Sequence, residues 1–306
     1  MTGDRTPECP PLAAGAYVAP GYQVLAHLYR TGWLDLYDAW SEERDCRCVV
    51  KVLRPGGSQD GEYRARLVQE GRWLAEFTHP HLVRAYETVA EPEPYVVLET
   101  LTGETLDRLL ERRRRRLAAG DLALLGVQLC SAAHYLHGRG LLHLDIKPAN
   151  VVIDCRRAKL LDLSIARPPG PGPPGAGTRG YLAPEQARGG ELTAATDVWG
   201  IGATLYEAAT GDPPHDPGAT GTGNSWSGSW STGAEDTPDP GEPPPVPPVT
   251  TRRRLPAGLA EAIDGALRPG PGARPTVRAL AALLDAQAPQ GRRAVRPPEE
   301  PDAPEP

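Results

Sequence analysis

The stretch His143-Leu144-Asp145-Ile146-Lys147-Pro148-Ala149-Asn150 places a carboxylate, an ammonium group and an amide in one short loop. It follows a segment with helical periodicity at residues 121–140. Asp145 can accept a proton, Lys147 can offset negative charge, and Asn150 can ligate a metal through its side-chain oxygen. The ordinary alternative is a polar loop after a helix, so the interpretation depends on matching groups elsewhere in the chain.

Three further charged residues suit the same chemistry. Lys51 lies in Val49-Val50-Lys51-Val52-Leu53, where strand alternation places it on one face among apolar neighbours. Glu70 lies in a segment with helical periodicity at residues 62–77, and Asp162 follows an apolar run. Taken singly, Lys51 is an ordinary strand lysine and Glu70 a solvated helix glutamate. Their order and spacing along the chain therefore carry the argument.

The basic residues are almost all arginine. The only lysines are Lys51, Lys147 and Lys159. A compact ammonium on a flexible stem does what a planar guanidinium cannot, so each retained lysine needs a reason. Two of the three lie in the segments described above.

These segments together resemble Hanks-type, eukaryotic-like bacterial serine/threonine protein kinases. Residues 143–150 are similar to the catalytic loop of that family, His-Arg-Asp-Leu-Lys-Pro-x-Asn, and residues 162–164 stand in place of its Asp-Phe-Gly segment. Residues 177–185 are similar to the end of the activation segment, Gly-Thr-x-x-Tyr-x-Ala-Pro-Glu. The resemblance covers about residues 22–286, and the arginine preference is similar to that of actinobacterial members.

The resemblance implies an α+β, bilobal protein-kinase-like fold, with a small β-rich N-lobe that carries helix C and a larger helical C-lobe. Strand patterns before residue 54 and helical patterns after residue 101 also favour two lobes with a cleft between them. The expected organisation is a flexible N-terminal segment at 1–21, a kinase domain at 22–286 (N-lobe 22–99, C-lobe 100–286, with a low-complexity insertion at 211–250), and a disordered, Pro-rich acidic tail at 287–306.

The resemblance further implies transfer of the γ-phosphate of ATP to serine and threonine hydroxyls of protein substrates, with Mg²⁺ or Mn²⁺ as the metal. Asp145 would orient the substrate hydroxyl, Lys147 would neutralise the γ-phosphate, and Lys51 paired with Glu70 would hold the α/β-phosphates. Thr178 matches the threonine that accompanies Ser/Thr specificity. The residues implied for ATP binding are Lys51, Gly32, Glu99, Leu101, Asn150 and Asp162, of which Asn150 and Asp162 would be metal ligands.

Three other residues have structural roles in the resemblance. Asp197, in Thr196-Asp197-Val198-Trp199-Gly200, would hold the catalytic loop from below. Arg274 matches the late arginine that pairs with Glu185.

The phosphate-covering loop departs from the family pattern. The three family glycines fall on Tyr29, Thr31 and Leu34, and only Gly32 is glycine. Glycine there lets backbone amides approach phosphate closely. Either the loop binds nucleotide weakly or Arg30 substitutes with side-chain charge. This departure supports the alternative of a pseudokinase that binds nucleotide or acts as a scaffold without turnover; a small-molecule kinase is a weaker option, because residues 177–185 shape a peptide platform in the family.

The activation segment also departs from the family pattern. Leu144 replaces the arginine that contacts a phosphorylated activation loop in the family, and residues 165–177 contain no Ser, Thr or Tyr. We therefore expect that phosphorylation between those positions is not the switch. Ser164 replaces the glycine of Asp-Phe-Gly, which gives up backbone freedom at that position and could make inactivating flips harder.

Composition excludes some classes of function. A formal net charge of -6 and a pI near 5.7 argue against nucleic-acid binding. No signal-peptide pattern is present and no apolar run reaches about 18 residues, so we expect a soluble cytoplasmic signalling enzyme without a membrane span. The five cysteines show no repeated metal-ligand spacing and are interpreted as reduced thiols rather than as disulfides or zinc ligands.

Some features remain open. Arg112–Arg116 is interpreted as a solvated surface, with docking of acidic substrates as the alternative, and Trp226 and Trp230 are either partner anchors or spare aromatics. The pattern identifies no physiological substrate, upstream signal or oligomeric state.

Overall fold

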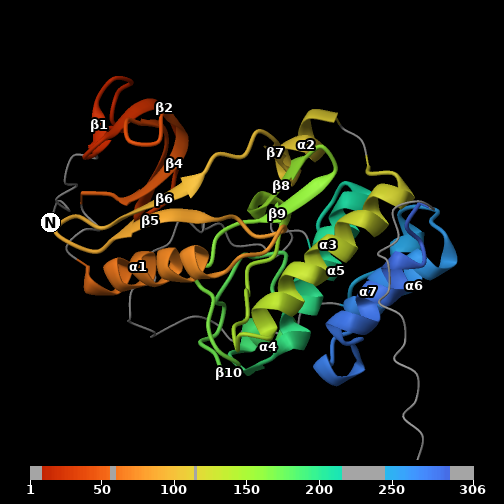
Figure 1. Cartoon of the computed structure of the whole chain (residues 1–306). Helices are drawn as coiled ribbons and strands as arrows, with labels where there is room; N and C mark the ends of the chain where they lie inside the picture. Colours follow the sequence, from red (N-terminus) through yellow and green to blue (C-terminus); the bar gives the residue numbers. More distant parts are fainter. Residues whose placement is uncertain (1–8, 56–59, 114–115, 216–244, 290–306) are drawn as a thin grey trace, which may run out of the picture.

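The structure, a computed structural model, describes residues 9–55, 60–113, 116–215 and 245–289 (Figure 1). Most of the expected insertion at 211–250, including Trp226 and Trp230, lies outside the described residues. So do most of the tail at 287–306 and part of Arg112–Arg116.

The first part of the chain forms a six-stranded antiparallel sheet in the order β1-β2-β3-β4-β6-β5. On β4, Cys48 and Val50 face a small apolar cluster on one side of the sheet. Lys51 and Leu53 take the opposite face because successive strand residues alternate. The strands are β1 Tyr17–Ala19, β2 Tyr22–Arg30, β3 Leu34–Ser41, β4 Cys46–Leu53, β5 Ala85–Val89 and β6 Tyr95–Glu99.

Helix α1, Gly61–Glu76, runs beside this sheet (Figure 1). Asp60 caps it by accepting hydrogen bonds from the backbone amides of Glu62 and Tyr63, which a helix cannot satisfy internally. The buried face of α1 includes Glu70, a charged residue among leucines. Gly71 lets the helix approach the sheet closely, because a Cβ there would lie 2.4 Å from Thr88 Oγ1.

The second part of the chain is mainly helical, and its main core is continuous with the α1 side of the sheet. Helix α5 is buried over nearly its whole length, and α3 packs against α5 and α7. Thr193 and Thr196 form a capping box at the start of α5, and Gly211 ends it in the left-handed conformation. The α-helices are α2 Leu106–Arg113, α3 Ala119–His137, α4 Pro184–Arg188, α5 Ala194–Thr210, α6 Ala257–Ala266 and α7 Val277–Asp285, and the 3₁₀ helices are η1 Pro148–Asn150, η2 Val249–Thr251 and η3 Pro271–Ala273.

Two small sheets complete the described part of the fold. One lies at the junction of the two parts, and the other lies beside α4 (Figure 1). The first consists of β7 Glu104–Thr105, β8 Val151–Asp154 and β9 Arg157–Leu160, and the second of β10 Gly170–Pro171 and β11 Glu191–Leu192. The predicted α+β fold with a β-rich lobe and a helical lobe is confirmed (Figure 1). Strand β1 begins before residue 22, whereas the domain limits themselves stay predictions. Within the described ranges, no helix combines the length and apolar character needed to cross a bilayer.

Candidate active site

Lys51, Glu70 and Asp162 come together between the two lobes. The Lys51 Nζ atom lies 2.9 and 2.7 Å from the two carboxylate oxygens of Glu70 and 3.0 Å from Asp162 Oδ1. Lys51 and Glu70 are buried, whereas the Asp162 side chain keeps 34% of its surface exposed. The structure thus joins β4, α1 and the segment after β9 at one ammonium group, as the sequence predicts for Lys51 and Glu70.

Burial and charge act against each other in this cluster. Burial alone would lower the pKa of Lys51, but the carboxylates of Asp162 and Glu70 raise it well above its usual range. Burial would raise the pKa of Asp162, yet the Lys51 ammonium holds it well below its usual range. Burial raises the pKa of Glu70 to about 7 against the opposing effect of Lys51. Asp162 is therefore the carboxylate that stays ionised and faces solvent.

The Asp162 segment is fixed by its own backbone. The amide of Leu163 donates to Glu70 Oε1 over 3.2 Å, and the amide of Ser164 donates to Asp162 Oδ1 over 3.1 Å. Leu163 is buried in the main core. Asp162 itself has a positive φ of 64°, and Ser164 does not. The serine at the family's glycine position therefore causes no left-handed strain.

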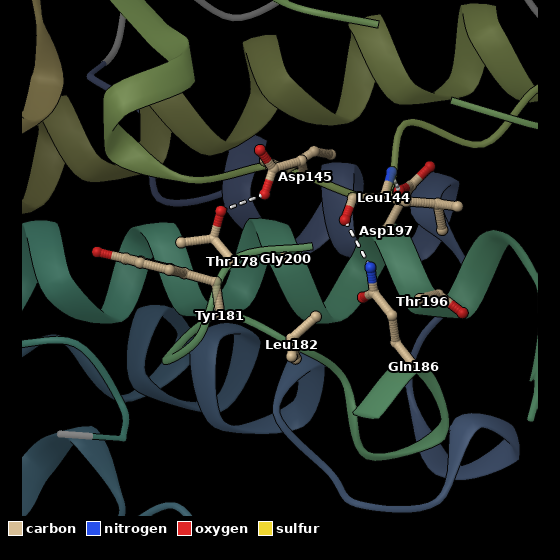
Figure 2. Close-up of a pocket in the computed structure, with 10 residues that line it drawn as sticks. Leu144, Asp145, Thr178, Tyr181, Leu182, Gln186, Thr196, Asp197 and Gly200 are labelled. Atoms are coloured by element: carbon tan, nitrogen blue, oxygen red, sulfur yellow. Dashed lines mark hydrogen bonds between the residues drawn. The ribbon is translucent and has the colours of Figure 1, made fainter. Parts of the chain in front are cut away.

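The catalytic-loop residues form a second cluster. Lys147 Nζ lies 2.7 Å from Asp145 Oδ2 and also contacts the hydroxyl of Thr178. Thr178 Oγ1 donates to Asp145 Oδ1 over 2.7 Å, as Figure 2 shows. Asn150 Nδ2 donates to the Asp145 carboxylate and to its backbone carbonyl, both over 2.9 Å. One carboxylate is thus held by three side chains from two segments of the chain.

Asp197 supports this loop from α5. Its carboxylate accepts hydrogen bonds from the backbone amides of His143 and Leu144 over 2.9 and 2.8 Å. His137 contacts the same carboxylate at 2.7 Å. Burial alone would raise the pKa of Asp197, but these contacts with His137 and His143 lower it. Leu144 adopts a positive φ of 68°, a conformation unfavourable for a branched residue, and this network holds it there.

A bidentate ion pair fastens the end of the activation segment. Arg274 donates from two nitrogens to the two oxygens of Glu185 over 2.7 and 2.9 Å, and both side chains are buried. Thr196 also donates to Glu185, over 3.0 Å. The guanidinium carbon of Arg274 lies 5.0 Å from the ring centroid of Trp199. The pairing expected from the sequence is thus present.

In the β2–β3 hairpin, Arg30, which the sequence offers as a substitute for the missing glycines, pairs with an aspartate. Arg30 Nε and Nη2 lie 2.7 and 2.8 Å from the two oxygens of Asp35, the residue directly opposite on β3. Gly32 lies exposed at the loop, without a positive φ. Trp33 stacks on Tyr63 of α1 at 4.9 Å between ring centroids. Arg30 thus binds its own hairpin, because strand pairing brings Asp35 within reach.

At the junction of the lobes, the Glu99 carboxylate forms an ion pair with Lys159 and accepts a hydrogen bond from the amide of Arg84 over 2.9 Å. Leu101 is partly buried against the main core. The Glu99 side chain is therefore engaged by protein groups, and the backbone of residues 99–101 remains the candidate contact for a base. No sequence motif indicated the Lys159–Glu99 ion pair, although the scarcity of lysine singles out Lys159.

The side chains present fit a magnesium ion. Magnesium takes oxygen ligands and is usually held by one or two protein groups together with phosphates. Asp162 offers an ionised carboxylate, and Asn150 offers its amide oxygen because it donates only through Nδ2. The amide of Leu161 donates to the Asn150 carbonyl over 2.8 Å, which ties the two candidate ligands together. Among the described residues, no cluster of three or more His, Cys, Asp or Glu suggests another metal site.

The chain is similar in sequence to known protein kinases. The sequence profile of the protein kinase domain matches residues 35–281. A probable serine/threonine-protein kinase of Streptomyces coelicolor is 33% identical over 206 residues, which cover 63% of this chain and 30% of that protein. The serine/threonine-protein kinase PknB of Mycobacterium tuberculosis is 35% identical over 179 residues, covering 54% and 28%. The chain therefore matches less than a third of the length of these relatives.

Solved structures agree with the fold. The kinase domain of PknI from Mycobacterium tuberculosis is 26% identical, with a TM-score of 0.68, over 90% of this chain and 99% of that domain. A second structure of the same domain is 25% identical, with a TM-score of 0.66. The similarity covers 90% of this chain and thus extends across both lobes.

Proposed function

This chain belongs to the protein kinase domain family, and we propose that it is a serine/threonine protein kinase that transfers the γ-phosphate of ATP to hydroxyls of protein substrates. The observation that carries the proposal is the convergence of Lys51 on both Glu70 and Asp162, at 2.7 and 3.0 Å. Binding of a nucleoside triphosphate requires a fixed cation for the phosphates and an ionised, solvent-facing carboxylate for the metal. Lys51 and Asp162 provide these two groups.

The residues take distinct roles in this proposal. Asp145 orients the attacking hydroxyl and accepts its proton, while Lys147 stabilises the negative charge of the moving phosphoryl group. Lys51, fixed by Glu70, holds the α- and β-phosphates. Asn150 and Asp162 would hold Mg²⁺ or Mn²⁺, which neutralises phosphate charge when bound. Most of the contribution is positioning and electrostatics, since this reaction asks for little covalent chemistry from the protein.

Several observations support a protein substrate with a Ser or Thr hydroxyl. Thr178 bonds both Asp145 and Lys147, so the segment at residues 177–185 contacts the proposed catalytic base through this hydroxyl. The relatives carry serine/threonine-protein kinase names. All five cysteines are free, which suits the reducing environment of a cytoplasmic protein.

A pseudokinase is the alternative that the β2–β3 loop favours, because that loop has lost the family glycines and commits Arg30 to Asp35. Incubation with labelled ATP, Mg²⁺ or Mn²⁺ and a generic basic protein separates the two. We expect label transfer by the wild-type chain and loss of it in Asp145→Asn, which should still bind nucleotide. Asp154→Asn, which changes a partly exposed aspartate that accepts a hydrogen bond from Thr102, is the matched control. Nucleotide binding without any transfer by the wild type would establish the pseudokinase.

A further inference from the structure

Lys159 is the one lysine of the chain to which the proposed chemistry gives no role. It lies on β9, the strand that leads into Asp162. Its ammonium forms an ion pair with Glu99 and also lies 3.4 Å from the carbonyl oxygen of Leu82. The two charged side chains are 26% and 19% exposed, so water only partly screens the pair. Lys159 is thus a partly buried tie between β9 and the end of β6.

Glu99 is also fixed from the sheet side. The amide of Arg84 donates to Glu99 Oε1 over 2.9 Å, and the amide of Glu99 donates to the carbonyl of Arg84 over 3.0 Å. Glu99 is therefore held by the β-rich lobe and by β9 at the same time. Its backbone leads into Leu101, the segment proposed to contact the base.

Strand β9 connects this tie to the proposed metal ligands. The amide of Leu160 donates to the carbonyl of His81 over 2.9 Å, and the amide of Val83 donates back to Leu160 over 3.1 Å. One residue later, the amide of Leu161 donates to the carbonyl of Asn150 over 2.8 Å. The Lys159–Glu99 ion pair, the β9 backbone and the Leu161–Asn150 hydrogen bond thus link Glu99 to Asn150 and to the start of the Asp162 segment.

We propose that Lys159 is a positioning residue for the nucleotide. By holding Glu99, it sets where the backbone of residues 99–101 meets a base, relative to Asn150 and Asp162, where phosphates and metal would lie. The inference rests on the proposed nucleotide site. A ligand with both a base and phosphates must contact residues 99–101 and the Asn150–Asp162 region at the same time. Its affinity therefore depends on the distance between these two regions, whereas the affinity of a ligand without a base does not.

Binding of ADP and of inorganic triphosphate, measured by calorimetry in the full chain, tests the proposal. We expect Lys159→Met to weaken ADP binding about five- to ten-fold, the worth of one partly buried ion pair, with triphosphate affinity changed less than about two-fold. The KM for ATP should rise by the same factor while kcat stays within about two-fold. Lys159→Arg, which keeps the charge, should restore ADP binding. Arg156→Met, which breaks the Arg156–Asp121 pair at the β8–β9 turn, is the matched control.

The partner residue provides a second test. Glu99→Gln should weaken ADP binding like Lys159→Met, and the double variant should lose little more, because both changes remove one interaction. Additive losses, equal weakening of ADP and triphosphate, or unchanged ADP affinity would each overturn the proposal. A wild-type chain that binds ADP but transfers no phosphate contradicts the proposed function alone. A chain that binds no nucleotide at all contradicts both.

Discussion

Gln186 donates a hydrogen bond from Nε2 to the backbone carbonyl of Leu144 over 2.7 Å (Figure 2), and the same group contacts the carbonyl of Ala176. It thereby joins the activation segment to the catalytic loop without any charge. Leu144 packs with Leu142 and Leu192 in a small buried cluster, and β10 pairs with β11 beside it. Apolar packing and backbone pairing thus surround Leu144, where the family pattern has an arginine.

The activation segment should therefore work without a phosphate. We expect phosphatase-treated protein to keep its transfer activity, because the apolar side chain of Leu144 cannot bind a phosphate group. Leu192→Ala should lower the free energy of unfolding by about 2–4 kcal/mol and reduce transfer, since it empties the centre of the cluster. Urea unfolding and labelled-ATP assays measure both, with Leu283→Ala, an exposed leucine, as the control. Activity that requires a phosphate on Ser164 or Thr178 would contradict this expectation.

Thr178 should matter through its hydroxyl. Thr178→Ser keeps a donor for Asp145 and should retain transfer within about three-fold. Thr178→Val keeps the shape but removes the hydroxyl, and should lower kcat about ten-fold or more, the worth of one charge-assisted hydrogen bond. Steady-state kinetics with both variants decides the point. Equal activity of the two variants would show that the contact has no role in transfer.

Stability should be sensitive to the loss of either partner of the Glu185–Arg274 pair. Removing one partner of a buried ion pair leaves an uncompensated charge, so Arg274→Met should cost about 3–5 kcal/mol of unfolding free energy. Arg274→Lys should also destabilise, because lysine cannot reproduce the bidentate contact. Denaturant unfolding measures each, with the exposed Arg278→Lys as a control. Should Glu185→Gln combined with Arg274→Met cost the full sum of the single changes, the two residues are not coupled.

His79 should make stability depend on pH. Burial, together with the positive charges of His81 and Arg139, lowers the pKa of His79 to about 4, from about 6.5 in an unfolded chain. The folded state then resists protonation, so the contribution of His79 is complete above about pH 6.5 and is lost as pH falls toward about 4. His79→Gln should flatten the stability curve in that window.

The exposed His134→Gln provides the comparison for this experiment. Urea unfolding midpoints measured at intervals between about pH 4 and 7 give the slope of stability against pH for each variant. Parallel curves for wild type and His79→Gln would mean that His79 titrates normally in the folded protein.

Substitution of Lys51 and substitution of Glu70 should have different effects on nucleotide binding and transfer. Lys51→Met removes the phosphate contact and leaves two carboxylates without a cation, so nucleotide affinity and transfer should both fall, transfer by about a hundred-fold. Glu70→Gln leaves Lys51 paired with Asp162, so we expect a smaller loss, mainly in kcat. Calorimetry and initial rates distinguish the two patterns. A Glu70→Gln variant as inactive as Lys51→Met would show that Glu70 does more than orient the lysine.

The sequence by itself determined the elements and the chemical groups. Strand alternation around Lys51 and helical periodicity around Glu70 are local patterns, and hydrophobic burial enforces them wherever the chain folds. The order of Lys51, Glu70, Asp145, Asn150 and Asp162 resembles that of the kinase family. That resemblance, together with strand patterns that precede helical ones, predicted two lobes and a phosphate-handling site.

Only the tertiary structure decided which groups share a partner. Lys51 meets two carboxylates at once, Arg30 pairs with Asp35 across the hairpin, and Lys159 reaches across to Glu99. Such contacts depend on strand register and on how the lobes pack, which no local pattern encodes. An ion pair forms where two side chains can leave water together at the least cost, and that cost is set only once the whole chain has folded.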